Sequence, residues 1–322
     1  MRRPRRVTLE GTHTKGLPVL QHLTIPRGPI ELAADLHLPD DDDGAAPRRV
    51  VVLSTPGSSV KEQIGANYAA RLAARGIAAL VFDPAHQGRS GGEPRDLEDP
   101  YRRAEDISSA IDALSTVPGV DPDRIGVLGI CAGGSYAVHT ARTDHRIRAV
   151  GTVVPSDIGA AFRGFQPDGP AAALDALART RAEEARTGEP TRTAWLPDSL
   201  AEAESLGVTD VDTLQAITYY RTERGRSEHS TNRRLTRSDA LLLGFDAFHL
   251  VDQLMTQPLQ VILAGRRGST GSYEHGMRLW DLAPNPVDLT VIEGAGHYEM
   301  YDEPAYVDQA VDRLAAFYRD HL

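Results

Sequence analysis

The sequence predicts an α/β fold with a mostly parallel central sheet flanked by helices. Short apolar runs bounded by turn residues alternate with segments of helical periodicity, and strands joined by crossover helices form parallel sheets. The chain of 322 residues is 41% hydrophobic, which is enough to bury a substantial core. The strand-like runs are Ile30–His37, Val50–Ser54, Ile77–Phe82, Ile125–Gly129, Ile147–Val154, Leu259–Ala264 and Leu289–Ile292.

Helical periodicity fills the connections between these runs. Apolar residues recur at intervals of three or four, which places them on one face of a helix. Such sets are Ile64, Tyr68 and Leu72, then Ile107, Ile111 and Leu114, and finally Val307, Val311, Leu314 and Tyr318. We therefore expect helices after the second and third strand-like runs and at the C-terminus.

The alternation predicts four segments. Residues 1–17 form a flexible basic arm, 18–156 and 258–322 form the two parts of the core, and 157–257 form a mainly helical insertion. The insertion includes the helical runs Ala171–Arg186 and Asp210–Arg224 and lies between two strands of the sheet. That position is above the carboxyl ends of the strands, where open α/β sheets bind ligands, so the insertion is a candidate lid. An insertion with no role in a pocket is the alternative.

Composition excludes several classes of protein. A net charge of −10 disfavours binding to nucleic acid, and no apolar run approaches the roughly 20 residues that cross a membrane. The single cysteine rules out an intramolecular disulfide and a thiolate zinc site. The N-terminus lacks the apolar stretch of a signal peptide. We expect a cytoplasmic protein with no metal. The sequence is compatible with a homodimer.

The sharpest motif is a nucleophile elbow, a strand-turn-helix in which Cys131 lies between Gly129 and Gly133. Flanking glycines allow a sharp turn that projects the nucleophile above the sheet. The following helix N-terminus should lower the thiol pKa, and the backbone N–H of Ala132 can stabilise an oxyanion. A small buried hydrophobic side chain is the alternative interpretation of a lone cysteine.

A thiol nucleophile needs a base, and His297 is the strongest candidate among 11 histidines. It follows the last strand and precedes the terminal helix, so it lies at the same edge as Cys131. His86 follows another strand at this edge, and we expect it to line the pocket. A histidine in a surface loop is the alternative for His297.

The second oxyanion donor should come from the loop after Val50–Ser54. Glycine and small residues in Thr55-Pro56-Gly57-Ser58-Ser59 allow a backbone N–H to approach a substrate closely. We expect the N–H of Ser58 to be this donor. A helix-capping role for Ser58 or Ser59 is equally compatible with the sequence.

Several stretches together resemble the dienelactone-hydrolase-like branch of the α/β-hydrolase superfamily. They are TPGSSVKEQ, FDPAHQGRSGGEPR, EDISSAIDAL, RIGVLGICAGGSYA, STNRR, FDAFHL and EGAGHYEMYDEPAYVD. The resemblance runs from about residue 18 to the C-terminus. It implies an α/β-hydrolase fold and a hydrolase with a Cys or Ser nucleophile, a histidine and an acid, without a cofactor. It implies no particular substrate.

The chain departs from that family where the acid is expected. The family carries it in a stretch similar to A-G-S-x-A-D-T, but here Ser269 takes the aspartate position. Asp157, after another strand, is a substitute acid, Glu274 is a weaker one, and capping of a helix or turn is the alternative for Asp157. Thr55 replaces the histidine expected before Pro56, which indicates an altered pocket.

These residues support two enzymatic hypotheses. The first is an esterase, thioesterase or lactonase that forms an acyl-enzyme on Cys131, with His297 as base and a small acyl or polyketide-like molecule as substrate. A thiolate-imidazolium pair forms more easily than an alkoxide-imidazolium pair, so a cysteine nucleophile depends less on the acid of the triad. The second is a biosynthetic enzyme with a degenerate triad that catalyses cyclisation, elimination, rearrangement or acyl transfer on a hydrophobic metabolite. A non-catalytic receptor is a third interpretation.

Overall fold

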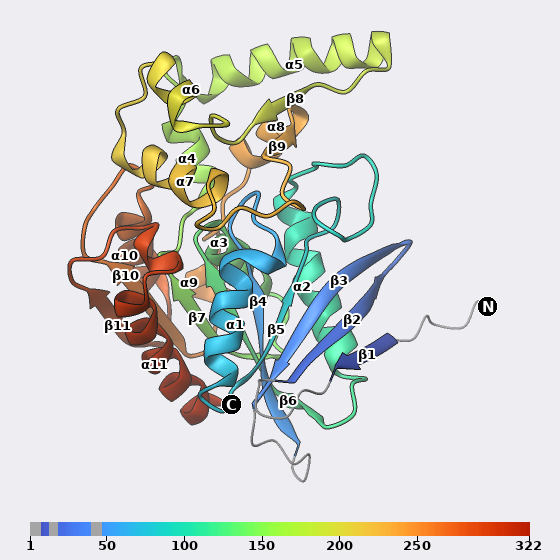
Figure 1. The fold of residues 1–322 in the computed structure, drawn as a ribbon, viewed down its shortest axis with the longest axis vertical. Coiled ribbons are helices and arrows are strands. Elements are labelled where there is room, and N and C mark those ends of the chain that lie inside the picture. Colours follow the sequence, from blue (N-terminus) through green and yellow to red (C-terminus); the bar gives the residue numbers. More distant parts are fainter. Residues whose placement is uncertain (1–7, 13–18, 40–46) are drawn as a thin grey trace.

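A computed structural model describes residues 8–12, 19–39 and 47–322, and a nine-stranded sheet forms its centre (Figure 1). The strand order is β1-β2-β3-β5-β4-β6-β7-β10-β11. The bounds are β1 Thr8–Thr12, β2 Val19–Arg27, β3 Ile30–Leu38, β4 Arg48–Ser54, β5 Ala78–Phe82, β6 Val120–Ile130, β7 Ile147–Val153, β10 Leu259–Ala264 and β11 Pro286–Ile292. Strands β5 to β11 in this order pair in parallel, whereas β1, β2 and β3 add an antiparallel edge. The predicted α/β fold is confirmed.

Each central strand buries both of its faces. In β4, Val50 and Val52 pack into one hydrophobic core, while Val51 and Leu53 pack into the other on the opposite side of the sheet. Successive side chains of a strand point to opposite faces, so a continuous apolar run must be covered by helices on both sides. This explains why the sequence shows unbroken apolar runs here.

Helices cover the two faces in two groups. The helix α1 (Ala66–Ala73), preceded by the π-helical turn η1 (Lys61–Gly65), packs on one face with α11 (Pro304–His321). The opposite face is covered by α2 (Pro100–Leu114), α3 (Ala132–Ala141) and α10 (Ser272–Leu282). Asp99 caps α2 by accepting hydrogen bonds from the backbone N–H groups of Tyr101 and Arg102. The three predicted amphipathic sets are buried, as expected.

Most of the chain between β7 and β10 forms the upper part of the molecule in Figure 1. It contains α4 (Ile158–Gly164), α5 (Gly169–Thr187), β8 (Arg192–Ala194), α6 (Leu200–Ser205), α7 (Val211–Arg221), β9 (Arg233–Leu235), α8 (Arg237–Leu243) and α9 (Val251–Leu254). We call residues 157–257 the insertion. The described helices of the chain lack the length and apolar character that a membrane crossing requires.

Four strands were not predicted. β8 and β9 form a separate antiparallel pair of three residues each, and β1 and β2 extend the edge of the main sheet. β2 mixes buried and partly exposed positions, so it lacks an unbroken apolar run. The prediction of a flexible arm over residues 1–17 was wrong for Thr8–Thr12, which pair with β2. The rest of that arm and the acidic run at residues 40–43 lie outside the described residues.

Candidate active site

Cys131 lies at a sharp elbow between β6 and α3. Its backbone has φ of 54° and ψ of −124°, an unusual conformation for a residue other than glycine. The neighbouring turn tolerates no side chain, because a Cβ on Gly133 would lie 1.9 Å from the carbonyl oxygen of Ser54. Gly134 N–H and Ser156 N–H both donate to the Cys131 carbonyl, at 2.9 Å each. The strand-turn-helix predicted from the glycine spacing is therefore present.

The thiol of Cys131 faces a cavity of about 630 Å³ at the carboxyl ends of the strands. The insertion contributes much of its wall, and the volume falls in the range of small-molecule sites. Apolar lining residues include Ile158, Phe162, Phe165, Trp195 and Leu196, and polar ones include Ser58, Asp210, Asp212, Ser269, Tyr220, Tyr298 and Tyr301. The cavity therefore favours an apolar ligand with a few polar groups.

The loop after β4 reaches this cavity at Ser58. Ser58 has a positive φ of 61°, and its carbonyl accepts a hydrogen bond of 3.0 Å from Ser230 Oγ of the insertion. Arg103 holds the base of the loop, because its buried guanidinium donates to the carbonyls of Thr55 and Pro56. Ser58 and the backbone of Ala132 both line the cavity beside Cys131. Their roles as oxyanion donors stay predictions.

His297 lies in the segment after β11 and is 2% exposed. Its Nδ1 atom is 2.9 Å from Ser272 Oγ, and its Nε2 atom is 3.2 Å from the Tyr301 hydroxyl. Burial lowers the His297 pKa to about 3, since the apolar surroundings disfavour the charged ring. The imidazole is therefore neutral at pH 7 and can accept a proton at Nε2.

Burial raises the pKa of the Cys131 thiol, and the nearby Asp212 carboxylate raises it further. Hydrogen bonds that the Tyr301 hydroxyl and the Ala132 N–H can donate to the thiolate form act in the opposite direction but do not reverse the shift. The prediction of a lowered thiol pKa was wrong, because desolvation outweighs the helix N-terminus. The resting pair is a neutral thiol and a neutral imidazole.

Asp157 does not contact His297, so the prediction of a substitute acid at this position was wrong. Its Oδ1 accepts from Ala160 N–H at 3.1 Å and caps α4, and its Oδ2 pairs with Arg278 at 3.1 Å. The capping alternative is thus the one the structure contains. Glu274 forms an ion pair with Arg267 at 3.6 Å on the surface. The hydroxyl of Ser272 occupies the place next to Nδ1 that an acid would take.

Ser269, at the aspartate position of the related family, does line the cavity. Its hydroxyl donates to Asp210 Oδ2 at 2.8 Å. One residue further on, Thr270 N–H donates to Asp212 Oδ2 at 3.0 Å. Both aspartates begin α7 of the insertion, so the insertion supplies carboxylates to the loop that lacks one.

His86 and Thr55 do not line the cavity beside Cys131, in contrast to the prediction. The loop after β5 folds back on itself, with His86 Nδ1 3.1 Å from the Pro94 carbonyl and His86 N–H bonded to Gly91. Thr55 is 2% exposed and lies beneath the cavity, where its carbonyl accepts from Arg103. Both residues are part of the support of the site.

Three residues that contact the site were not foreseen: Ser272, Tyr301 and Asp212. Tyr301 follows His297 by four residues, a spacing that could have suggested a shared helical face. Asp212 carries no such signal, because its partner Thr270 is 58 positions away in the sequence.

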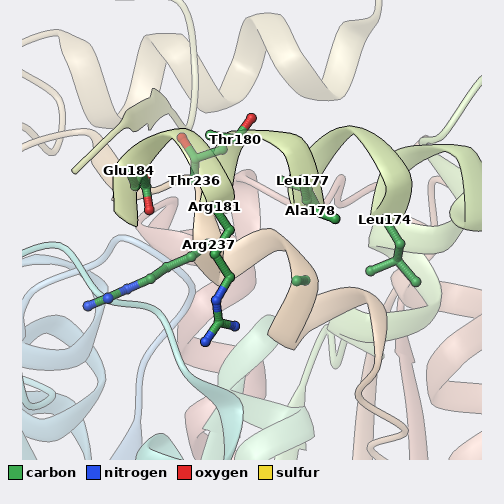
Figure 2. Close-up of a pocket in the computed structure, with 9 residues that line it drawn as sticks. Leu174, Leu177, Ala178, Thr180, Arg181, Glu184, Thr236 and Arg237 are labelled. Atoms are coloured by element: carbon green, nitrogen blue, oxygen red, sulfur yellow. The ribbon is translucent and has the colours of Figure 1, made fainter. Parts of the chain in front are cut away.

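A second cavity, of about 240 Å³, lies between α5 and α8 (Figure 2). The side chains of Leu174 and Arg181 extend from α5 toward α8. This cavity shares no lining residue with the one at Cys131. In the described ranges, no group of three or more His, Cys, Asp or Glu side chains is arranged to hold a metal ion.

The fold and the elbow define a class of protein, and comparison with known proteins agrees. Residues 44–310 match the alpha/beta hydrolase family, and the chain belongs to this family. It is 36% identical to the protein YcjY of Escherichia coli (strain K12) over 296 residues, or 91% of this chain and 95% of that one.

Two further relatives extend the comparison. The crystal structure of the protein PA2218 from Pseudomonas aeruginosa superposes with a TM-score of 0.84, at 28% identity, and covers 98% of this chain and 99% of that one. Thiohydrolase apmlB of Arthrinium phaeospermum is 38% identical over 126 residues, which is 39% of this chain and 40% of that protein. The similarity to apmlB therefore covers less than half of either chain.

Proposed function

We propose that this protein is a hydrolase that cleaves thioesters or related esters and lactones through an acyl-enzyme on Cys131. One observation carries the proposal: Cys131 stands on a strained elbow and faces a cavity, with His297 on the adjoining segment. Strained backbone at a cavity is a feature of functional sites. The family and the similarity to a protein named thiohydrolase support it.

The proposed reaction has two stages. Cys131 Sγ attacks the acyl carbon while its proton passes to the His297 side, and the backbone N–H groups of Ala132 and Ser58 stabilise the oxyanion. The tetrahedral intermediate collapses, the bond to the leaving group breaks, and the leaving thiol or alcohol takes the proton. Water then attacks the acyl-enzyme with His297 as general base and releases a carboxylic acid. The steps require no cofactor.

The lining of the cavity favours a hydrophobic acyl group of moderate size as the ligand. Trp195 and Phe162 meet edge to face with ring centroids 6.1 Å apart on the insertion side. Arg234 stacks over Trp195 at 4.8 Å from the ring centroid and pairs with Asp239, which fixes this wall. We therefore propose that the insertion acts as a lid over an acyl chain or a small polyketide-like group.

Acyl thioesters of N-acetylcysteamine, with chains of two to twelve carbons, test the proposal. We expect thiol release and, after rapid quench, a protein mass increase equal to the acyl group, located on Cys131. Cys131→Ala should lose both signals, and His297→Asn should slow acylation by about 100-fold. His145→Asn, in the segment that follows α3 and away from the cavity, is the matched control. Full turnover by Cys131→Ala would refute the mechanism.

Acyl transfer or cyclisation is the second candidate. The observation that favours it is the lack of a carboxylate next to Nδ1 of His297, where Ser272 lies instead. A weaker base deacylates slowly with water, which leaves time for another acceptor. Polyketide transferase claH of Penicillium crustosum, 25% identical over 268 residues (80% of this chain, 84% of that one), supports this candidate.

Product analysis separates the two candidates. The acyl-enzyme is formed first, and water alone or water with a series of primary alcohols and amines is then added. Hydrolysis predicts free acid as the main product in every case. Transfer predicts an acylated acceptor and an acyl-enzyme that persists for minutes in water.

A further inference from the structure

The Tyr301 hydroxyl lies between the candidate nucleophile and the candidate base. It is 3.2 Å from His297 Nε2, and Tyr301 lines the cavity together with Cys131, where its hydroxyl lowers the pKa of the thiol. The hydrogen bonds of the His297 ring within the described residues go to Ser272 and Tyr301, and none goes to Cys131. The phenol therefore lies where it can connect the nucleophile and the base.

Packing fixes the phenol in this place. Tyr301 ends the short 3-10 helix η2 (Glu299–Tyr301) and is 1% exposed. Its ring meets the rings of Tyr219 and Tyr298 edge to face, with centroids 5.1 and 5.0 Å apart. Its backbone carbonyl accepts a hydrogen bond of 2.8 Å from Asn67 Nδ2 of α1. Little rotamer freedom remains, so the position of the hydroxyl is part of the fold.

The hydrogen-bond directions around Tyr301 are consistent with proton transfer. In the tautomer with the proton on Nδ1, His297 donates to Ser272 Oγ, and the unprotonated Nε2 accepts from the Tyr301 hydroxyl. The Tyr301 oxygen can then accept from the Cys131 S–H. This gives one continuous chain, S–H to oxygen and O–H to nitrogen, in the neutral resting state.

We propose that Tyr301 is a catalytic residue that relays the proton from Cys131 to His297, which rests on the acyl-enzyme function proposed above. During attack the S–H bond breaks and its proton bonds to Tyr301 Oη. At the same time the original O–H proton moves to Nε2 and forms the imidazolium. As the leaving group departs, Nε2–H returns its proton to Tyr301 Oη, and the Tyr301 O–H proton passes to the leaving sulfur or oxygen. No oxidant, reductant or additional co-reactant takes part.

Tyr301→Phe tests the relay, with Tyr219→Phe as the control because it removes a hydroxyl from the same aromatic cluster outside the cavity. We expect Tyr301→Phe to slow acylation of Cys131 by about 100-fold at pH 7. The loss should shrink as the pH rises, because thiolate formed by hydroxide no longer needs the relay. Tyr219→Phe should keep the wild-type rate and pH profile. Circular dichroism and thermal melting check that both variants fold.

A proton inventory in mixtures of H₂O and D₂O supplies a second readout. A relay with two protons in flight predicts a curved dependence of the acylation rate on deuterium content for the wild type and a linear one for Tyr301→Phe. Acylation by Tyr301→Phe at the wild-type rate with an unchanged pH profile would overturn the relay and leave the proposed function intact. Absence of a Cys131 adduct in the wild type would overturn the proposed function and the relay with it.

Discussion

Ser272 Oγ lies 2.9 Å from Nδ1 of His297, in the position where a triad carboxylate would orient and stabilise the ring. A hydroxyl can accept the Nδ1 proton or donate to an unprotonated Nδ1, but it does not neutralise an imidazolium. Together with burial of the ring, this accounts for a base that stays neutral well below pH 6.

Ser272→Asp should therefore change the titration of His297. A carboxylate beside Nδ1 favours the charged ring, so we expect the His297 pKa to rise by more than about one unit. Histidine Cε1–H chemical shifts followed by NMR between pH 3 and 8 measure it. The control is Ser269→Asp, whose side chain faces Asp210 in place of the imidazole. An unchanged His297 titration in Ser272→Asp would contradict the assigned contact.

Removal of the negative charge at Asp212 should lower the Cys131 pKa. The carboxylate raises that pKa by electrostatic repulsion of the thiolate, whereas Asn retains an oxygen that can accept from Thr270 N–H. We expect Asp212→Asn to speed alkylation of Cys131 by iodoacetamide about threefold at pH 8, a change of under one pKa unit. Asp312→Asn on α11 is the control. A slower reaction in Asp212→Asn would show that the Asp212 carboxylate does not raise the Cys131 pKa.

His297 should make the protein less stable in acid. Its pKa is lowered in the folded state to about 3, so between pH 6.5 and pH 3 the unfolded chain binds a proton that the folded protein does not. The contribution is absent above pH 6.5 and destabilises the fold progressively as the pH falls through that window, by up to about 4 kcal/mol.

Urea unfolding of wild type and His297→Gln at several pH values isolates this effect. The comparison with the variant is needed because Asp83 and Asp106 also titrate in this range. Burial raises their pKa values to about 6, so they stabilise the fold as the pH falls, whereas His297 destabilises it. We expect the difference in unfolding free energy, wild type minus variant, to decrease from pH 7 to pH 4. A constant difference would mean that His297 is not shielded from protons.

Lys61 should be a major contributor to stability near the active site. Its side chain is 5% exposed, and its Nζ donates to Asp35 Oδ2 at 2.6 Å and to Glu62 Oε1 at 2.9 Å. Lys61→Ala leaves the Asp35 carboxylate without its buried partner, at a cost of about 3 kcal/mol. Thermal and urea unfolding measure the loss, and Arg186→Ala, in an exposed pair on α5, should leave the stability unchanged.

Much of the fold could be predicted because its signals are local. The apolar runs of the central strands reflect burial on both faces, and the glycines around Cys131 reflect a turn in which backbone atoms leave no room for a Cβ. The strand β2, second from the edge of the sheet, and the short strands β8 and β9 were missed. Their partly exposed residues form no continuous apolar pattern.

The sequence by itself determined the class of fold, the elbow at Cys131 and the place of His297 after the last strand, since each depends on a short stretch of chain. Only the tertiary structure decided which groups touch them. Asp157 pairs with Arg278, Ser272 contacts Nδ1 of His297, and Tyr301 contacts Nε2 of the same ring. The insertion also brought Asp212 to Thr270. Such contacts depend on how distant segments pack and on which groups burial desolvates, and neither follows from local residue patterns.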